Sequence, residues 1–312
     1  MRHPPRVTAA GLPARVRIHE VGARDGLQNE PRPVPLALKL ELLDRLADCG
    51  LSDLEVTSLV RPDRVPQLAD AEQLLRRLER RDDVRYSVLV PNRRGLERAL
   101  ALGVAEVAVF ASATESFANA NLGRSRAESM AEIRALAGEA LAAGLALRGY
   151  VSMCFGDPWE GEVAEEEVVN VVDELFAVGC AEVSLGDTIG VATPGQVKHL
   201  LGALGAAGHA PAALAVHFHD TFGQALANTF SALEEGIEVV DSSVAGLGGC
   251  PFAGSATGNL ATEDLLWQLE GLGIATGVDL EGLVRTADWV CRALGREERS
   301  RTLRALEQEV RG

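Results

Sequence analysis

Short runs of apolar and β-branched residues alternate along the chain with longer segments in which apolar positions recur at helical spacing. The short runs predict strands at residues 16–21, 51–58, 85–90, 104–111, 145–152, 180–187, 213–219 and 237–244. The longer segments predict helices at residues 35–49, 69–80, 94–102, 125–143, 165–178, 194–207, 224–235 and 261–270. Eight strand–helix units in succession favour an α/β fold, the closed (β/α)8 or TIM barrel.

The predicted strands are almost continuously apolar, which is typical of parallel strands that are covered on both faces. An open, doubly wound sheet is the alternative. Its GxGxxG fingerprint is missing after the first strand, where the chain reads Gly-Ala-Arg-Asp-Gly-Leu over residues 22–27. We therefore predict a catalytic barrel over residues 15–275, a flexible N-terminal tail over residues 1–14, and C-terminal helices packed on the barrel over residues 276–312.

Composition narrows the function class. The chain has 30 Lys and Arg against 45 Asp and Glu, a formal net charge of −15. A chain this acidic lacks the basic face that nucleic acid requires, so we expect neither nucleic acid nor a membrane surface as a partner. No apolar run approaches the roughly 20 residues that span a bilayer, and no signal-peptide pattern opens the chain. Five scattered cysteines without CxxC spacing favour a reducing compartment, and we predict a cytoplasmic protein.

Polar residues follow several of the predicted strands. In a barrel of this type the chemistry lies at the carboxyl ends of the strands. The candidates at those ends are Arg24, Asp25, Glu55, Thr57, Ser58, Ser184, Asp187, Thr188, His217, His219, Asp220, Cys250 and Asn259. The opposite ends of the strands show no comparable set, and this asymmetry indicates an enzyme.

Two histidines form the core of a predicted metal site. His217 and His219 are two residues apart on a strand, so both side chains point to the same face. Asp25 and Asn259 follow neighbouring strands of the predicted barrel. Two nitrogen and two oxygen ligands without a thiolate suit Mg²⁺ or Mn²⁺, although the spacing leaves Zn²⁺ open. A hydrogen-bonded histidine beside an incidental neighbour is the alternative.

Three further charged residues have both functional and structural interpretations. The planar guanidinium of Arg24 suits a developing enolate or carboxylate oxygen. Glu55 points either into the barrel mouth or toward the helices, and a salt bridge to Arg24 is its structural alternative. Asp187 either lines the site or caps the turn that follows its strand.

Cys250 lies between two glycines and a proline, so we expect no regular structure there. A glycine-rich loop can carry its thiol into the site and out again. A thiol with a pKa near 8.5 is protonated at neutral pH and can donate a proton. The cysteines at 49, 180 and 291 are expected to be buried as small hydrophobic side chains.

Four segments resemble the 3-hydroxy-3-methylglutaryl-CoA (HMG-CoA) lyases of the DRE-TIM metallolyase superfamily: RDGLQNE at 24–30, SLGDTIG at 184–190, HFHDT at 217–221 and SVAGLGGCP at 243–251. The similarity extends from about residue 16 to residue 295. It implies a barrel that binds Mg²⁺ or Mn²⁺ and cleaves HMG-CoA into acetyl-CoA and acetoacetate, a reaction of leucine degradation. The implied metal ligands are Asp25, His217, His219 and Asn259. The implied catalytic and substrate-lining residues are Arg24, Asp25, Glu55, His217, Cys250, Gln28 and Asp187.

One loop departs from the family pattern. The family's strand-five loop reads Ser-Cys-x-x-Gly-Cys-Pro, whereas residues 152–158 here read Ser-Met-Cys-Phe-Gly-Asp-Pro. A branched analogue such as 3-hydroxy-3-isohexenylglutaryl-CoA is therefore an alternative substrate. A condensing acyltransferase similar to isopropylmalate synthase is a second alternative, and Cys250 argues against it. A barrel that binds CoA ligands without catalysis is a third, and the complete set of charged residues argues against that.

The implied CoA thioester is anionic, whereas the chain is acidic overall, so local positive charge is required near the barrel mouth. Arg94 is the predicted substrate contact. The further candidates are Arg61, Arg64, Arg93 and Arg124, all in predicted loops after strands. The resemblance also implies a homodimer.

Overall fold

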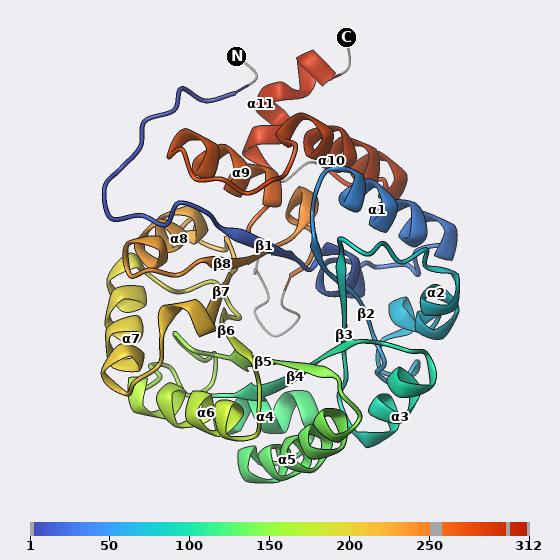
Figure 1. The fold of residues 1–312 in the computed structure, drawn as a ribbon, viewed down its shortest axis with the longest axis vertical. Helices are drawn as coiled ribbons and strands as arrows, with labels where there is room; N and C mark the ends of the chain where they lie inside the picture. The colour runs from blue at the N-terminus through green and yellow to red at the C-terminus, as the bar shows by residue number, and fades with distance from the viewer. Residues whose placement is uncertain (1–2, 250–257, 298–299, 311–312) are drawn as a thin grey trace.

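The computed structural model describes residues 3–249, 258–297 and 300–310. Each strand pairs in parallel with the next along the chain, and the eighth pairs with the first, so the sheet closes into a barrel (Figure 1). The strands are β1 (Arg17–Glu20), β2 (Asp53–Ser58), β3 (Arg85–Leu89), β4 (Glu106–Ser112), β5 (Ala146–Ser152), β6 (Glu182–Asp187), β7 (Leu214–Phe218) and β8 (Val239–Ser242).

Helices surround the barrel (Figure 1). The α-helices are α1 (Leu36–Asp48), α2 (Ala71–Arg77), α3 (Arg93–Ala101), α4 (Glu115–Leu122), α5 (Arg126–Ala142), α6 (Glu165–Ala177), α7 (Pro194–Ala206), α8 (Ala225–Glu234), α9 (Thr262–Gly271), α10 (Leu280–Leu294) and α11 (Arg301–Val310). The short helices are η1 (Gly22–Gly26), η2 (Pro66–Leu68), η3 (Pro211–Ala213) and η4 (Val244–Gly246). The predicted TIM barrel with extra C-terminal helices is confirmed.

Helix boundaries follow local capping chemistry. Ser125 and Glu128 form a capping box at the start of α5. Asp279 caps α10 by accepting hydrogen bonds from two backbone N–H groups, and α10 ends at Gly295, which has a φ of 65°. Helix α4 was not predicted, because its sequence Glu-Ser-Phe-Ala-Asn-Ala-Asn-Leu has no clear apolar stripe at helical spacing.

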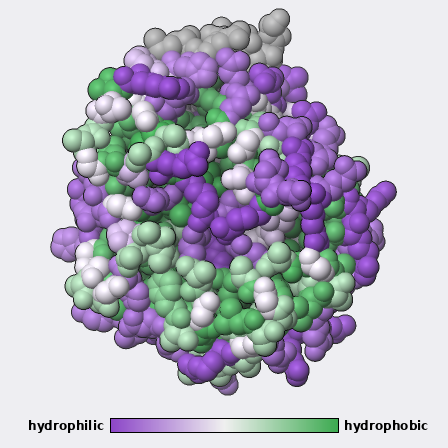
Figure 2. Space-filling model, viewed as in Figure 1, coloured by the Kyte–Doolittle hydropathy of each residue, from purple (hydrophilic) through white to green (hydrophobic). Residues whose placement is uncertain are grey.

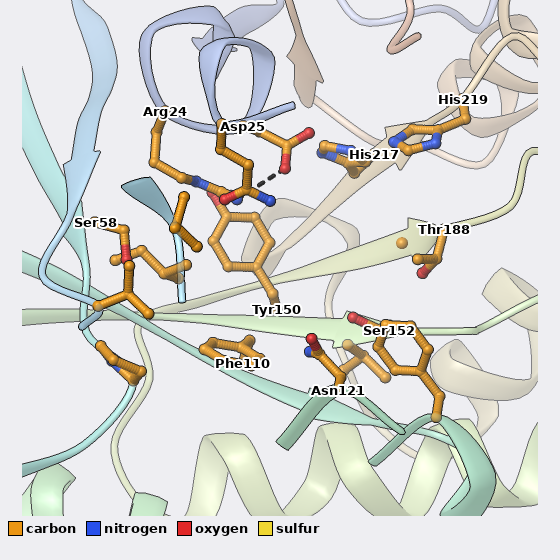
Figure 3. Close-up of a pocket in the computed structure, with 18 of the residues that line it drawn as sticks. Arg24, Asp25, Ser58, Phe110, Asn121, Tyr150, Ser152, Thr188, His217 and His219 are labelled. Carbon is orange, nitrogen blue, oxygen red and sulfur yellow. Dashed lines mark hydrogen bonds and ion pairs between the residues drawn. The ribbon is translucent and has the colours of Figure 1, made fainter. Parts of the chain in front are cut away.

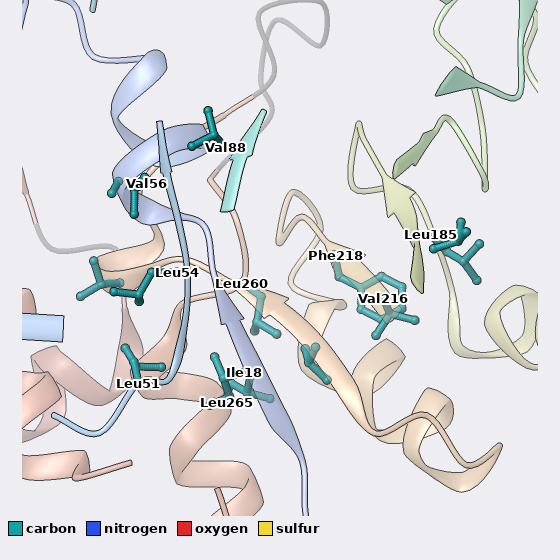
Figure 4. Packing of buried hydrophobic residues seen from close by; sticks show 14 of the residues in the cluster. Ile18, Leu51, Leu54, Val56, Val88, Leu185, Val216, Phe218, Leu260 and Leu265 are labelled. Atoms are coloured by element: carbon teal, nitrogen blue, oxygen red, sulfur yellow. The ribbon is translucent and has the colours of Figure 1, made fainter. Parts of the chain in front are cut away.

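The main hydrophobic core lies between the barrel and its helices. Ile18 and Leu54 on the strands are no more than 4% exposed, as is Leu265 on α9. Figure 4 shows these side chains, with Val216 and Leu260, packed in the same layer. Complete burial of a side chain of this size contributes about 1.5–3 kcal/mol. This layer fixes the positions of the strand ends that carry the site.

Five strands also start with a charged residue, which corrects the expectation that the amino ends carry no set of polar residues comparable to that at the carboxyl ends. Arg17 of β1 forms ion pairs with Asp53 of β2 and Glu182 of β6. Arg85 of β3 contacts Glu106 of β4 at 2.9 Å and Asp53 at 3.8 Å. Figure 2 shows hydrophilic side chains gathered at the centre of one face of the barrel. These ion pairs link five strands, so this end of the barrel is closed by a structural network.

The segment before the barrel lies along α9 and the loop after it. The Val7 N–H donates to the Gly271 carbonyl at 2.8 Å, and Arg6 forms a 2.8 Å ion pair with Glu270. Arg15 pairs with Ala275 in a single parallel bridge. Among the described residues, no helix is long and apolar enough to cross a membrane.

Candidate active site

Arg24 and Asp25 lie in one tight turn directly after β1. The Val21 carbonyl accepts hydrogen bonds from the backbone N–H groups of Arg24, Asp25 and Gly26, at 3.1, 2.8 and 3.2 Å. These bonds wind the chain into the π-helical turn η1, a geometry found frequently at functional sites. Both side chains consequently line the mouth of the barrel (Figure 3).

The predicted metal-ligating residues come together. Asp25, His217 and His219 each offer a ligand atom, and these atoms all lie within 4.8 Å of one another. Asn259 reaches the same place because residues 258–260 run antiparallel to the end of β7. Leu260 donates its N–H to the Phe218 carbonyl at 3.0 Å, and His219 pairs with Asn259.

Hydrogen bonding leaves acceptor atoms at this cluster without partners, which fits a bound cation. The Asn259 amide donates to Asp25 Oδ2 at 2.8 Å and to the Leu247 carbonyl at 2.9 Å. Among the described atoms, Asn259 Oδ1 and His219 Nδ1 are buried and accept no hydrogen bond. Buried acceptors are normally satisfied, and a bound cation would take lone pairs from both atoms. The donor set of two imidazoles, a carboxylate and an amide oxygen suits a divalent ion.

The electrostatics favour the ligating forms of these side chains. Burial and the neighbouring His217 lower the pKa of His219 to about 4, so the imidazole is neutral at pH 7. Burial raises the pKa of Asp25, but Arg24 and the two histidines outweigh it, so that pKa lies below its usual range. A metal ion requires both a neutral imidazole and an ionised carboxylate.

His217 is oriented from within the barrel. Its Nδ1 lies 3.4 Å from Asp241 Oδ2, and that carboxylate also accepts a hydrogen bond from Ser184 at 2.8 Å. Arg148, which is 1% exposed, donates two hydrogen bonds to Asp241 at 2.7 and 3.2 Å. Burial raises the pKa of Asp241, but Arg148 and the nearby histidines outweigh burial and hold that pKa below its usual range. An ionised carboxylate behind a ligating histidine fixes its tautomer and direction.

Arg24 is held between two carboxylates. Its Nε donates to Glu55 Oε2, and its Nη1 donates to Asp25 Oδ1 at 2.8 Å. Glu55 is fully buried, so the structure realises the salt bridge that was its structural alternative. Burial lowers the pKa of Arg24, but both carboxylates raise it above its ordinary value. Arg24 is therefore a permanently charged, fixed guanidinium at the cavity wall.

A cavity of about 240 Å³ opens beside these groups (Figure 3). Arg24, Asp25, His217 and His219 line one end of it. The remaining wall includes Ser58, Phe110, Asn121, Tyr150, Ser152 and Thr188. A charged end and a wall of aromatic, hydroxyl and amide side chains suit a small polar acyl group.

Tyr150 and Asn121 line the cavity but were not predicted from the sequence. The Arg24 guanidinium carbon lies 5.7 Å from the Tyr150 ring centroid, and the Tyr150 hydroxyl lies 3.2 Å from His19 Nε2. Tyr150 could have been found from alternation, because Arg148, Tyr150 and Ser152 share the inward face of β5. Asn121 belongs to the unpredicted helix α4 and had no such signal.

The remaining candidates lie in different places. Gln28 lines the cavity, whereas Asp187 and Arg94 are not among the residues lining it. Asp187 is buried and accepts backbone N–H groups of the loop after β6 at 2.9 and 3.1 Å, which is the capping role considered above. Arg94 is exposed on the first turn of α3. Cys250 lies outside the described residues, although Gly249 before it lines the cavity.

The departure at residues 152–158 has a structural role here. Asp157 Oδ1 accepts the backbone N–H groups of Trp159 and Glu160 at 2.7 and 2.8 Å, and its Oδ2 accepts the Thr114 hydroxyl at 2.6 Å. Asp157 therefore ties the loop after β5 to the start of α4. Met153 packs with Phe117 of α4, a residue that lines the cavity. The departure from the family pattern at residues 152–158 therefore affects the part of the cavity wall that would face an acyl group.

A buried acid supports the turn after β8. Glu263 Oε2 accepts the Ala245 N–H at 3.1 Å, and Ala245 has a left-handed φ of 58°. Burial, reinforced by the neighbouring Asp264 carboxylate, raises the pKa of Glu263 to about 8.

This pKa predicts that alkaline pH destabilises the protein. Between about pH 4.5 and 8 the folded state keeps a proton on Glu263 that the unfolded chain has lost, so stability falls as pH rises through that window. The neutral variant Glu263→Gln should lose roughly 2–3 kcal/mol less unfolding free energy between pH 6 and pH 9 than the unmodified protein. Urea unfolding at both pH values measures this, and equal losses would contradict the prediction.

Comparison with known proteins assigns a family. A family model described as HMGL-like matches residues 15–290, which include the whole barrel. The chain belongs to the HMGL-like family. It is 50% identical to the mitochondrial hydroxymethylglutaryl-CoA lyase of Rattus norvegicus over 295 residues, which cover 94% of this chain and 90% of that protein. Other relatives in the HMGL-like family include mitochondrial and cytoplasmic HMG-CoA lyases.

Solved structures agree. Hydroxymethylglutaryl-CoA lyase from Pseudomonas aeruginosa is 47% identical, with a TM-score of 0.93 that covers 96% of this chain and 99% of that one. An HMG-CoA lyase from Acinetobacter baumannii, solved in complex with coenzyme A and 3-methylmalate, is 34% identical. Its TM-score is 0.90, over 96% of this chain and 97% of that one.

Proposed function

We propose that this HMGL-like chain is a metal-dependent carbon–carbon lyase that cleaves HMG-CoA into acetyl-CoA and acetoacetate. The observation that carries the proposal is the convergence of Asp25, His217 and His219 beside the fixed guanidinium of Arg24 in one cavity. Membership of the HMGL-like family and the similarity to HMG-CoA lyases support this reaction.

The donor set supports Mg²⁺ or Mn²⁺ as the resident ion, held by Asp25, His217, His219 and Asn259. Such an ion, when bound, polarises oxygen ligands and makes a hydroxyl group easier to deprotonate. We propose that Asp25 or one of the two histidines relays the proton of the substrate's tertiary hydroxyl, because their ligand atoms all lie within 4.8 Å of one another.

Arg24 supplies the second requirement of the reaction. When the C2–C3 bond of the acyl chain breaks, the electron pair moves into the thioester and forms the enolate of acetyl-CoA, while C3 becomes the ketone of acetoacetate. A guanidinium that is already fixed and desolvated stabilises that negative oxygen without reorganising. Protonation of the enolate carbon completes the product. Cys250 is the proposed donor of this proton, supported by the position of Gly249 at the cavity.

The CoA moiety is proposed to leave the cavity near the loops after β2 and β3, because Val60, Val65 and Pro91 line it there. Arg61, Arg64 and Arg94 belong to these same stretches of chain and are exposed to solvent. They are the candidates for contacts with CoA phosphates. A homodimer and a cytoplasmic location are proposed with the family. The relatives include both mitochondrial and cytoplasmic lyases.

A second substrate has one specific observation in its favour. Met153 and Asp157 replace the thiols of the family's strand-five loop and set the wall formed by α4. A longer acyl branch, as in 3-hydroxy-3-isohexenylglutaryl-CoA, would meet that wall.

The substrate is tested by comparing three reactions of the metal-loaded protein: cleavage of HMG-CoA, cleavage of the isohexenyl analogue, and condensation of acetyl-CoA with a 2-oxo acid. The proposal expects the highest kcat/KM for HMG-CoA and no condensation product. A preference for the analogue would transfer the function to the branched substrate. Condensation alone would contradict the lyase assignment.

A further inference from the structure

We infer that Glu20, which does not line the cavity, is a positioning residue for the metal site. It fixes the turn after β8, and that turn orients the Asn259 carboxamide. The inference rests on the metal site of the proposed function and adds a residue that supports this site without lining the cavity.

Glu20 ties three segments together through one buried carboxyl group. The side chain ends β1 and is 1% exposed. Its Oε1 accepts the backbone N–H groups of Gly22 and Val244, both at 2.9 Å, and its Oε2 accepts the Thr262 hydroxyl at 2.5 Å. The three donors lie at the start of η1, η4 and α9. Glu20 therefore joins the turn that carries Arg24 and Asp25 to the turn after β8.

The turn after β8 also fixes the orientation of the Asn259 side chain. The Leu247 carbonyl accepts one Asn259 amide hydrogen at 2.9 Å, and Asp25 Oδ2 accepts the other at 2.8 Å. Because both amide hydrogens are bound, the Asn259 Oδ1 atom can point in one direction only. Asn259 Oδ1 is a buried oxygen without a hydrogen-bond partner among the described atoms. The position of the Leu247 carbonyl thus decides where a ligating oxygen points.

Close packing makes this connection stiff. A Cβ added to Gly26 would lie 2.8 Å from the Leu247 Cβ. One added to Gly258 would lie 2.0 Å from the Gly246 carbonyl oxygen. Neither position has room for a displacement of the turn without moving the chain beside it. The Leu247 N–H also donates to the Val244 carbonyl at 3.1 Å. A shift of Val244 after loss of the Glu20 carboxyl would therefore be passed on to Leu247, and with it to the Asn259 carboxamide.

The test is Mn²⁺ binding to the metal-stripped full chain, measured by electron paramagnetic resonance, with HMG-CoA kinetics as a second readout. Glu20→Met fills the space but accepts no backbone hydrogen. It is expected to raise the Kd for Mn²⁺ by about 10–100-fold, the range for residues that support metal ligands. Glu20→Gln keeps the acceptor for Gly22 and Val244, and Thr262 can accept from its amide. Its Kd should stay within about threefold of the unmodified protein.

Thr262→Val is a milder variant in case Glu20→Met does not fold. It removes the hydroxyl that donates to Glu20 Oε2 and contacts Ser242 Oγ at 2.9 Å, but leaves both backbone donors on Glu20 Oε1, and should give a smaller rise in Kd than Glu20→Met. Unchanged Mn²⁺ affinity in folded Glu20→Met, or equal losses in Glu20→Met and Glu20→Gln, would overturn the inference. Absence of Mn²⁺ binding in the unmodified protein would instead contradict the metal site of the proposed function.

Discussion

Replacing Arg24 with methionine should lower kcat for HMG-CoA cleavage by about 10²–10³-fold. The variant loses the fixed positive charge that meets the developing enolate oxygen, and no other Arg or Lys side chain lines the described part of the cavity. Since the enolate exists only as the bond breaks, kcat should fall much more than KM rises. Steady-state measurement of acetyl-CoA formation over a range of HMG-CoA concentrations gives both constants.

Arg134→Met is the matched control for this prediction. Arg134 is exposed on α5 and forms a 3.2 Å ion pair with Glu174, away from the cavity lining. Exposed pairs of this kind contribute about 0–1 kcal/mol, so kcat should change less than twofold. If Arg24→Met kept its kcat, or if both variants lost activity equally, Arg24 would not be the group that stabilises the enolate.

Replacing Arg148 with methionine should destabilise the protein by about 3–5 kcal/mol. The substitution leaves Asp241, which is fully buried, without the guanidinium that donates to it at 2.7 and 3.2 Å. An uncompensated carboxylate in the barrel interior must either stay charged at high cost or take up a proton. Urea unfolding at pH 7 measures the change in unfolding free energy.

The double variant Arg148→Met with Asp241→Asn separates the charge from the packing. Removing the uncompensated charge of Asp241 should restore part of the lost stability, so the effects of the two single substitutions on unfolding free energy should not be additive. Strict additivity would mean that Arg148 stabilises the barrel by packing alone. Mn²⁺ affinity should also fall in Asp241→Asn, because Asp241 faces Nδ1 of His217.

The sequence was sufficient to predict the barrel and to predict that the proposed metal ligands lie together. Strand and helix periodicities were strong, and residues 217 and 219, two apart on a strand, must point to the same face. Asn259 was grouped with these histidines from the sequence, and its bridge to His219 shows how the structure brings them together. The family's lyase motifs agreed with this reading.

The roles of polar residues inside strands were harder to predict from the sequence. Arg17, Asp53 and Glu182 begin apolar strands, and only the closed barrel shows that Arg17 forms ion pairs with both carboxylates. Tyr150 lies within a strand rather than after it, so a search of strand ends passed over it. Asp187 has the same sequence signal whether it lines a site or holds a loop, and its two backbone hydrogen bonds favour the loop.

A metal titration of the stripped protein with HMG-CoA as substrate, quantifying acetyl-CoA and acetoacetate, tests the metal-dependent lyase activity most directly. We expect no cleavage before Mg²⁺ or Mn²⁺ is added, equal amounts of both products afterwards, and loss of activity when EDTA is added. Cleavage that is unaffected by EDTA would contradict the metal-dependent mechanism. No cleavage by the metal-loaded protein would contradict HMG-CoA as the substrate.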